Sequence, residues 1–566
     1  ASGYQALYSN TTGGYNTANG AWALWANTTG DYNTANGFGA LQNNTTGYQN
    51  TANGYQSLLN NTTGYMNTAN GMSALRANTG GDMNTATGHE TLYSNISGNN
   101  NTANGFRALR NNTIGTDNVA IGSDALYANT EGSSNTATGY QALTGNTTAG
   151  NNSAHGFYAL RANTTGQYNT AIGAHVLQSS STASHNTANG YVSLSANTTG
   201  QYNTAIGSHS LSDNTSGNNN TASGYQSLYV NTTGSDNTAN GYQALTLNTT
   251  GSDNTANGYQ ALQNNTTGNY NTANGYQSLL NNTTGFKNIA NGMSALRANT
   301  GGSNNTANGI EALYTNTTGH TNTANGKGAL YLNTTGDYNT AAGYQALFSN
   351  TTGDYNTAAG YQANVSSGNL TNATAIGKGA TVSASNKIRL GNTSVTAIEG
   401  QVAFTSVSDG RIKENIQEAV PGLSFIANLR PVTYTLNTRK QDVLTMQAMP
   451  DSIQEERMLS DDEYLASSSI VRTGFIAQEV EAAAKKVGFD FDGVSTPQNE
   501  TDLYGIRYAE FVVPLVKAMQ EQQEIIEGQE TKINGQQATI TELKTTIDQQ
   551  KNDYLLLLRR IEALEK

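Results

Sequence analysis

The histidines and carboxylates of the chain are the side chains that could bind a metal or cleave a glycosidic bond, but their spacing supports neither chemistry. Glycoside cleavage needs two carboxylates at a defined separation across the sugar. Asp31, Asp337 and Asp354 share one phase of a long repeat, whereas Glu90, Glu131 and Glu311 lie at other phases. The chain has no cysteine, and its six histidines form no ligand-spaced cluster: His89, His155, His175, His185, His209 and His320. We therefore expect no cofactor and no metal site.

Four short segments in the last third of the chain are more informative, because of their order. They are Ser408–Ile416, Leu429–Tyr434, Gly474–Val480 and Tyr508–Phe511, and a long predicted helix follows. In this order they resemble the endosialidase-type intramolecular chaperone domain. That domain ends phage tail spikes and fibres and some other trimeric surface proteins. The resemblance covers about residues 404–530.

The resemblance implies a peptidase that cleaves its own chain with a serine–lysine pair. Ser408 and Lys413 match the family's spacing, so Ser408 would be the nucleophile and Lys413 its general base. A serine hydroxyl is inert near neutral pH without a base, and a lysine of pKa about 10.4 becomes a base only when burial lowers that value. Assembly of a trimer could supply the burial. From the residues alone, Ser408 or Asp409 reads as a helix N-cap, and both interpretations can hold together.

The position of the cut is left open by the geometry of the junction formed by Val407, Ser408 and Asp409. The resemblance places the scissile bond between Ser408 and Asp409. A serine that attacks its own carbonyl closes a strained four-membered ring, whereas attack on the carbonyl of Val407 closes a five-membered one. Attack from a neighbouring subunit avoids the difficulty, so we assign the Ser408 junction without choosing its side.

The C-terminal stretch, residues 526–566, carries a heptad pattern. Ile526, Ile533, Ile540, Ile547, Tyr554 and Ile561 are spaced by sevens, and Gln529, Gln536, Leu543, Gln550, Leu557 and Leu564 follow three residues after them. Such a pattern predicts a coiled coil, and isoleucine at the a positions suits three strands better than two.

Residues 1–377, which precede these segments, consist of a repeat whose length does not change. A glycine recurs every 17 residues from Gly3 to Gly377, an alanine lies two residues before each, and a leucine lies four residues after each from Leu7 to Leu347. Fixed spacing of this kind predicts a solenoid, in which each coil buries its few apolar residues between two neighbours. With about 4.8 Å between coils, the 22 intervals would give a rod on the order of 100 Å long.

Other columns of the repeat have predicted roles. Asn10, Asn27, Asn44 and Asn265 should form an amide ladder along the stack. A second glycine in each coil, such as Gly13, Gly30 and Gly268, should mark a corner with positive φ. The strands should fall on Asn-Thr-Ala-x-Gly, while residues 259–264 could form a strand or one helical turn. For the large side chains after the main glycine, such as Tyr55, Met72 and Phe106, we predict a role in packing, with carbohydrate stacking as the alternative.

The repeat changes after Gly360, where Asn364 occupies a leucine position and the next units are shorter. The shorter units resemble the left-handed parallel β-roll of trimeric autotransporter adhesin heads, which implies a homotrimer. We expect a mostly β fold: a β-solenoid rod at 1–377, a shorter-period roll and neck at 378–403, an α+β chaperone domain at 404–525, and a trimeric coiled coil at 526–566.

The first 400 residues and the rest of the chain differ in their density of charged residues. Residues 1–400 carry 10 Lys and Arg against 13 Asp and Glu, whereas residues 401–566 carry 17 against 26. An acidic chain without a basic patch is a poor ligand for nucleic acid. No stretch approaches the roughly 18 apolar residues of a membrane helix, so we expect neither nucleic acid nor membrane insertion.

These features together predict a trimeric fibre for attachment, as a phage tail fibre or an adhesin shaft, located on a virion tail or at a cell surface. Its partners would be two further copies and a cell-surface glycan or protein receptor. The C-terminal domain would set the register of the rod, since nearly identical coils could otherwise slip by a whole repeat. The alternatives are a polysaccharide depolymerase and an ice- or glycan-binding solenoid, the latter because threonines such as Thr17, Thr34 and Thr51 could face outward.

Overall fold

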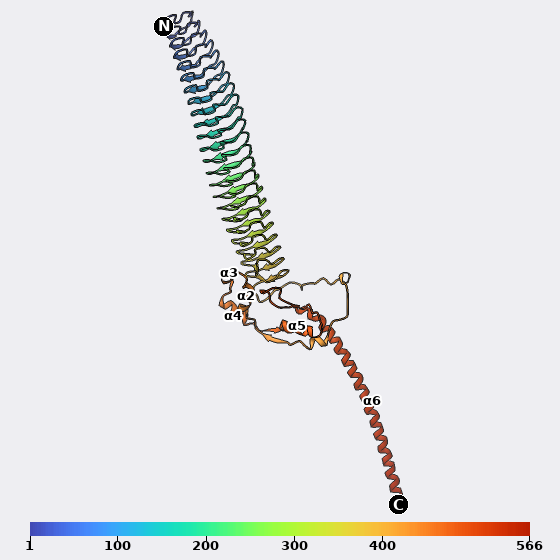
Figure 1. Cartoon of the computed structure of the whole chain (residues 1–566). Coiled ribbons are helices and arrows are strands. Elements are labelled where there is room, and N and C mark those ends of the chain that lie inside the picture. The colour runs from blue at the N-terminus through green and yellow to red at the C-terminus, as the bar shows by residue number, and fades with distance from the viewer. Residues whose placement is uncertain (566) are drawn as a thin grey trace. The chain divides into compact units, whose positions relative to one another are not determined.

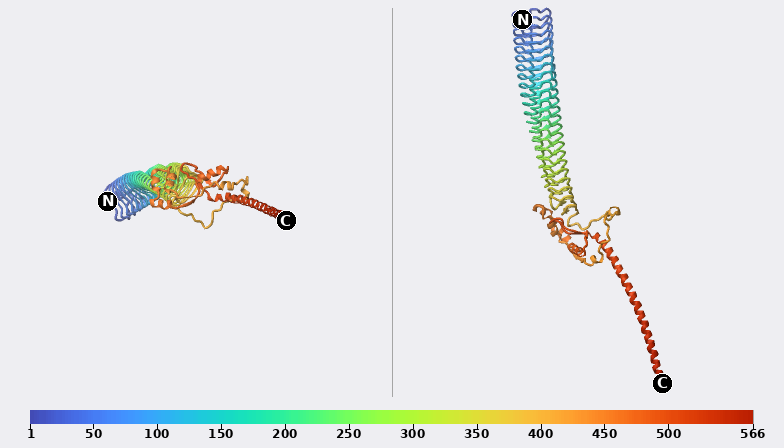
Figure 2. Two further views of the ribbon diagram at one scale, coloured as in Figure 1. Left: turned by 90° about the horizontal axis from the view of Figure 1, so that it is seen from below. Right: turned by 45° about the vertical axis from the view of Figure 1, so that its right-hand side comes forward.

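A computed structural model describes residues 1–565, and the chain divides into two compact units, Ala1–Arg389 and the part from Leu390 onward (Figure 1). The first unit is a stack of coils, which Figure 2 shows from two further directions. The predicted β-solenoid is confirmed. Its strands are β1 (Thr17–Asn19), β2 (Thr34–Asn36), β3 (Thr51–Asn53), β4 (Thr68–Asn70), β5 (Thr85–Thr87), β6 (Thr102–Asn104), β7 (Val119–Ile121), β8 (Thr136–Thr138), β9 (Ser153–His155), β10 (Thr170–Ile172), β11 (Thr187–Asn189), β12 (Thr204–Ile206), β13 (Thr221–Ser223), β14 (Thr238–Asn240), β15 (Thr255–Asn257), β16 (Thr272–Asn274), β17 (Ile289–Asn291), β18 (Thr306–Asn308), β19 (Thr323–Asn325), β20 (Thr340–Ala342), β21 (Thr357–Ala359), β22 (Asn364–Val365), β23 (Thr374–Ile376), β24 (Thr381–Val382) and β25 (Ile388–Leu390).

Strands of successive coils pair in parallel and in register. Thr17 lies opposite Thr34 and Ala18 opposite Ala35, and the same pairing continues from β2 to β3. The strand alanines and the leucines of the following turn are fully buried and form one continuous core along the stack. A coil with so few apolar residues is stable only between two others, which is the physical basis of a solenoid.

The stretch after the main glycine is neither a strand nor a helical turn. In the coil that begins at Gly258, Gln260 and Leu262 have φ of 54° and 51°, in the left-handed region. Each such residue costs about 1–2 kcal/mol for an L-amino acid. Hydrogen bonds to both neighbouring coils offset this cost, since Gln260 N donates to Tyr242 O at 2.9 Å and Leu262 N donates to Ser278 O at 3.0 Å.

The prediction of positive φ at the second glycine is wrong. Gly13, Gly30 and Gly268 lie outside the left-handed region, and the positive φ falls two residues later, as at Tyr270 with 59°. Glycine occurs at this position because coils approach closely there: a Cβ on Gly268 would lie 2.3 Å from the carbonyl oxygen of Gly285.

The predicted asparagine ladder is present. Asn265 Nδ2 donates to Asn248 Oδ1 at 2.8 Å and to Gly268 O at 2.9 Å, and Asn282 Nδ2 donates to Asn265 Oδ1 at 2.7 Å. A second buried ladder, which the sequence analysis did not assign, runs through the asparagine before each strand. There, Asn254 N donates to Asn237 Oδ1 at 3.1 Å and Asn254 Nδ2 donates to Gly268 O at 2.9 Å. Both ladders satisfy polar groups inside the rod.

The aromatic column after the main glycine stacks on itself. The rings of Tyr242 and Tyr259, and those of Tyr259 and Tyr276, lie 5.2 Å apart and within 10° of parallel. Both ring faces of Tyr259 are therefore covered by neighbouring rings. Stacking of a sugar needs an open ring face, so this arrangement favours the packing role over carbohydrate stacking.

The solenoid closes with a changed coil. Asn364, at the leucine position, is buried, and its Nδ2 donates to Ser349 Oγ at 3.1 Å. Its strand β22 pairs in parallel with β24 through Asn364 and Thr381. The shorter period continues the stack, since Thr374 N donates to Lys387 O at 2.8 Å.

The second unit is mixed and mainly helical. Phe425 is fully buried among Val480, Phe491 and Phe511, which are the centre of its small core. None of the helices among residues 1–565 is long and apolar enough to cross a membrane. The elements are η1 (Gly410–Ile412), α1 (Leu423–Ile426), β26 (Val432–Tyr434), α2 (Thr438–Met446), α3 (Asp451–Arg457), α4 (Asp461–Ser468), β27 (Arg472–Gly474), α5 (Ala477–Lys486), β28 (Val494–Ser495), β29 (Gly505–Ile506), η2 (Tyr508–Phe511) and α6 (Val512–Leu564).

Candidate functional site

The candidate site lies at Ser408, in a long connection whose one regular element is the single turn η1. The large apolar side chains around it are exposed: Phe404 is 95% exposed, Val407 83% and Ile416 76%. Apolar groups usually leave water when a chain folds. In this respect the segment differs from the rod, whose alanines and leucines are fully buried.

The turn η1 brings the two predicted catalytic residues together. Lys413 Nζ donates a hydrogen bond to Ser408 Oγ at 2.8 Å, although the two residues are five positions apart. This distance is within the range needed for proton transfer between a nucleophile and its base. Nothing further tests their assignment, which stays a prediction, as does the choice between the bonds on either side of Ser408.

The N-cap of the turn is Asp409, not Ser408. Asp409 Oδ1 accepts a hydrogen bond from Arg411 N at 2.9 Å, so the Ser408 hydroxyl is left for Lys413. The Arg411 side chain also pairs with the Asp409 carboxylate and holds the pKa of that carboxyl below its usual value.

Both members of the pair are exposed in the protomer. A lysine becomes a general base only where burial disfavours its charged form. The protomer therefore supplies the geometry of a serine–lysine pair but not the dry surroundings that would make the lysine a base.

The other three motif segments pack against one another. Strands β26 and β27 pair antiparallel through Thr433 and Thr473. Arg430 forms an ion pair with Glu479 of α5, and Phe475 N donates to Tyr508 Oη at 3.2 Å. The segments on which the resemblance rests thus form one structural unit, and the Ser408 segment leads into it.

A polar network that the sequence analysis missed connects the two sides of the predicted cut. Thr393 Oγ1 and Tyr464 Oη both donate to Asp442 Oδ2 at 2.9 Å. Thr393 precedes Ser408, whereas the other two residues follow it. The sequence did contain a signal for α4, the helix that carries Tyr464. This signal is a capping box, in which the side chains of Ser460 and Glu463 bond each other's backbone N–H.

No group of three or more histidine, cysteine, aspartate or glutamate side chains in the described part of the chain could hold a metal ion. In a comparison with protein families, residues 408–489 match the model described as the chaperone of endosialidase. The match begins at Ser408 and lies within the predicted range. No curated protein matches the chain.

Proposed function

Because the chain carries an endosialidase-type chaperone domain behind a long β-solenoid, as in phage tail fibres, we propose that it is a trimeric attachment fibre. The C-terminal domain brings three copies together, sets their register and then cuts the chain at the Ser408 junction. The observation that carries this proposal is the exposed apolar row of α6.

Helix α6 has 53 residues, and its heptad positions have no apolar cover in the protomer. Ile533 is 60% exposed, and Ile526, Ile540, Ile547, Leu557 and Leu564 are exposed with it. The helix begins two heptads before the predicted seam, and the exposed Val512, Leu515 and Met519 extend the same a and d pattern to its start. An apolar row of this length calls for partner helices.

The solenoid has a physical need for such a device. Its strand pairs repeat with little change, Thr to Thr and Ala to Ala, from β1 to β21. Three rods displaced by one coil would therefore meet nearly the same surfaces. Helices that associate at one end fix the alignment before the rods come together.

The proposed cut uses the Ser408–Lys413 pair. The Ser408 hydroxyl adds to the carbonyl carbon of the scissile peptide while the Lys413 amine accepts its proton. The C–N bond then breaks, and the lysine returns the proton to the leaving nitrogen. Water hydrolyses the resulting ester and frees the serine. Desolvation on assembly would lower the pKa of Lys413 and make it the base, so cleavage would follow completed assembly.

Two measurements test this proposal. Mass spectrometry and a denaturing gel should show wild-type chain cut at the Ser408 junction, and intact chain for Ser408→Ala and Lys413→Ala, with Ser406→Ala as the matched control. Light scattering of the uncut variants should give three copies. Continued cutting of either variant, or a single copy in solution, contradicts the proposal.

The receptor is proposed to be a cell-surface glycan or protein, with the fibre on a virion tail or at a cell surface. A glycan array, read for binding and for released product, separates an adhesin from a depolymerase. One observation favours a second candidate, ice binding: Thr17, Thr34 and Thr51 form a threonine row in register, about 4.8 Å apart. Thermal hysteresis of the purified rod tests it.

A further inference from the structure

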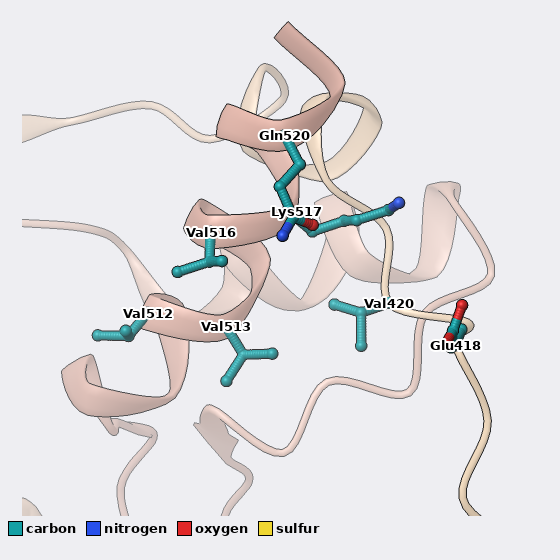
Figure 3. Close-up of a pocket in the computed structure, with 7 residues that line it drawn as sticks. All are labelled: Glu418, Val420, Val512, Val513, Val516, Lys517 and Gln520. Carbon is teal, nitrogen blue, oxygen red and sulfur yellow. The ribbon is translucent and has the colours of Figure 1, made fainter. Parts of the chain in front are cut away.

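The second unit has an apolar groove beside the start of α6 (Figure 3). Val512, Val513 and Val516 of α6 form one wall, and Val420 of the preceding connection faces them. Glu418, Lys517 and Gln520 form its rim, and the cavity has a volume of about 440 Å³. Four valines around a space of this size leave a binding surface that the protomer itself does not fill.

The groove lies beside the heptad seam of α6 and only partly within it. If Ile526 and Ile533 are a positions, Val512 is an a position, Val516 an e position and Val513 a b position. A side chain at e flanks the contact between helices, and a side chain at b lies outside it. Association through the seam therefore leaves most of the groove open to a further segment.

The same chain carries an apolar segment that lacks cover. Within residues 402–416, Val402, Phe404, Val407, Ile412 and Ile416 are all exposed. These side chains surround the Ser408 junction. Burial of such side chains is favourable, so contact between the exposed groove and the exposed segment would stabilise an assembly that brings them together.

We infer that the groove of one copy holds residues 402–416 of a neighbouring copy, and thereby positions the Ser408 junction for cleavage. This inference rests on the proposed trimer and names the surface that completes its site. Each copy has one groove and one segment. Three copies around an axis can therefore cover all three grooves with the three segments. The rim carries one charge of each sign, Glu418 and Lys517, and Lys517 offers an opposite charge to Glu414, a carboxylate of the segment outside the Asp409–Arg411 pair.

The arrangement explains how assembly could activate the serine–lysine pair. Lys413 is exposed in the protomer, and placing its segment against the valine wall would remove water from the ammonium group. Desolvation disfavours the charged form of lysine. The neighbouring copy thus supplies the missing surroundings, and a lone protomer cannot cut.

Charge placed in the groove tests the inference in the full-length chain. Val513→Asp and Val516→Asp should each slow cutting at the Ser408 junction at least tenfold, because a carboxylate opposes both the apolar segment and the loss of charge on Lys413. Val471→Asp is the matched control, since Val471 is 69% exposed and lies outside the groove. Wild-type cutting rates for both groove variants overturn the inference.

Cross-linking covers the case in which a groove variant fails to assemble. The chain has no cysteine, so Val513→Cys can be combined with Phe404→Cys or Val407→Cys in a Ser408→Ala background. Oxidation should link different copies and give dimers and trimers on a non-reducing gel, whereas Val471→Cys with either segment cysteine should not. Links within one copy, or none, overturn the inference. If wild-type chain still forms trimers and is cut, the proposed function stands without it.

Discussion

The rod and the C-terminal unit differ in how completely one copy of the chain satisfies its own apolar groups. In the rod, each coil buries its alanine and leucine against neighbouring coils of the same chain. In the C-terminal unit, the segment around Ser408, the groove at Val513 and the row along α6 are all exposed. The rod is a stack that buries its own apolar residues within a single chain, whereas the C-terminal unit leaves several apolar surfaces exposed.

The largest effect is expected from breaking the seam of α6. Ile533→Asp places a carboxylate in the proposed contact between helices, where an unpaired buried charge is very costly. We expect the trimer to be lost and cutting at Ser408 with it, as measured by light scattering and a denaturing gel. Ala538→Asp, on the opposite side of the same helix, should leave both unchanged. A trimeric Ile533→Asp variant would show that the seam does not hold the copies together.

A cavity in the rod should have a smaller effect and leave assembly intact. Leu262→Ala removes a fully buried side chain, and such changes cost about 2–5 kcal/mol. Hydrogen exchange should show faster opening of the adjoining coils. Leu247→Ala, where the leucine is 42% exposed, is the control and should cost under about 1 kcal/mol. Equal effects at the two sites would mean that the leucine column does not stabilise the stack.

Each hydrogen bond of the buried asparagine ladder should contribute less to stability than a buried leucine. Asn265→Ala leaves Asn248 Oδ1 without its donor inside the rod, which costs about 1–3 kcal/mol. Asn240→Ala breaks a similar amide pair, Asn240 to Asn257, on the exposed face, where water replaces the lost partner. Thermal unfolding of the two variants should separate these cases, and an equal loss would contradict a role for burial.

The smallest effect concerns the polar network of Asp442. Burial raises the pKa of Tyr464 to about 12, above about 10 for a tyrosine in an unfolded chain. The unfolded chain therefore loses this proton first, so the contribution of Tyr464 to stability is complete below pH 10 and is lost as pH rises toward 12. The denaturation midpoint of the wild-type chain should fall over this pH range, and the midpoint of the Tyr464→Phe variant should fall less steeply. Identical pH profiles would contradict the shift.

Much of the rod could be predicted because its residues repeat. Identical residues at one spacing must meet in a stack, so the buried Ala18 and Leu24 and the ladder through Asn265 followed from the pattern alone. The conformation of Gln260 and Leu262 did not, because propensities describe a residue within its own segment. Here hydrogen bonds to the coils on both sides decide the backbone.

The candidate site, like the rod, could be predicted from the sequence only in part. The order of four short segments identified the chaperone domain and pointed to Ser408 and Lys413. The contact between them, the cap at Asp409 and the groove beside α6 depend on how separate segments meet.

The sequence by itself determined the spacing of the coils, the residues of their core and the kind of domain that follows, since periodic burial and a distinctive motif order are local properties of the chain. Only the tertiary structure decided which glycines allow close approach of coils and which apolar surfaces stay open at the C-terminal unit. Both depend on distances between residues far apart in sequence, and close packing of the backbone fixes those distances.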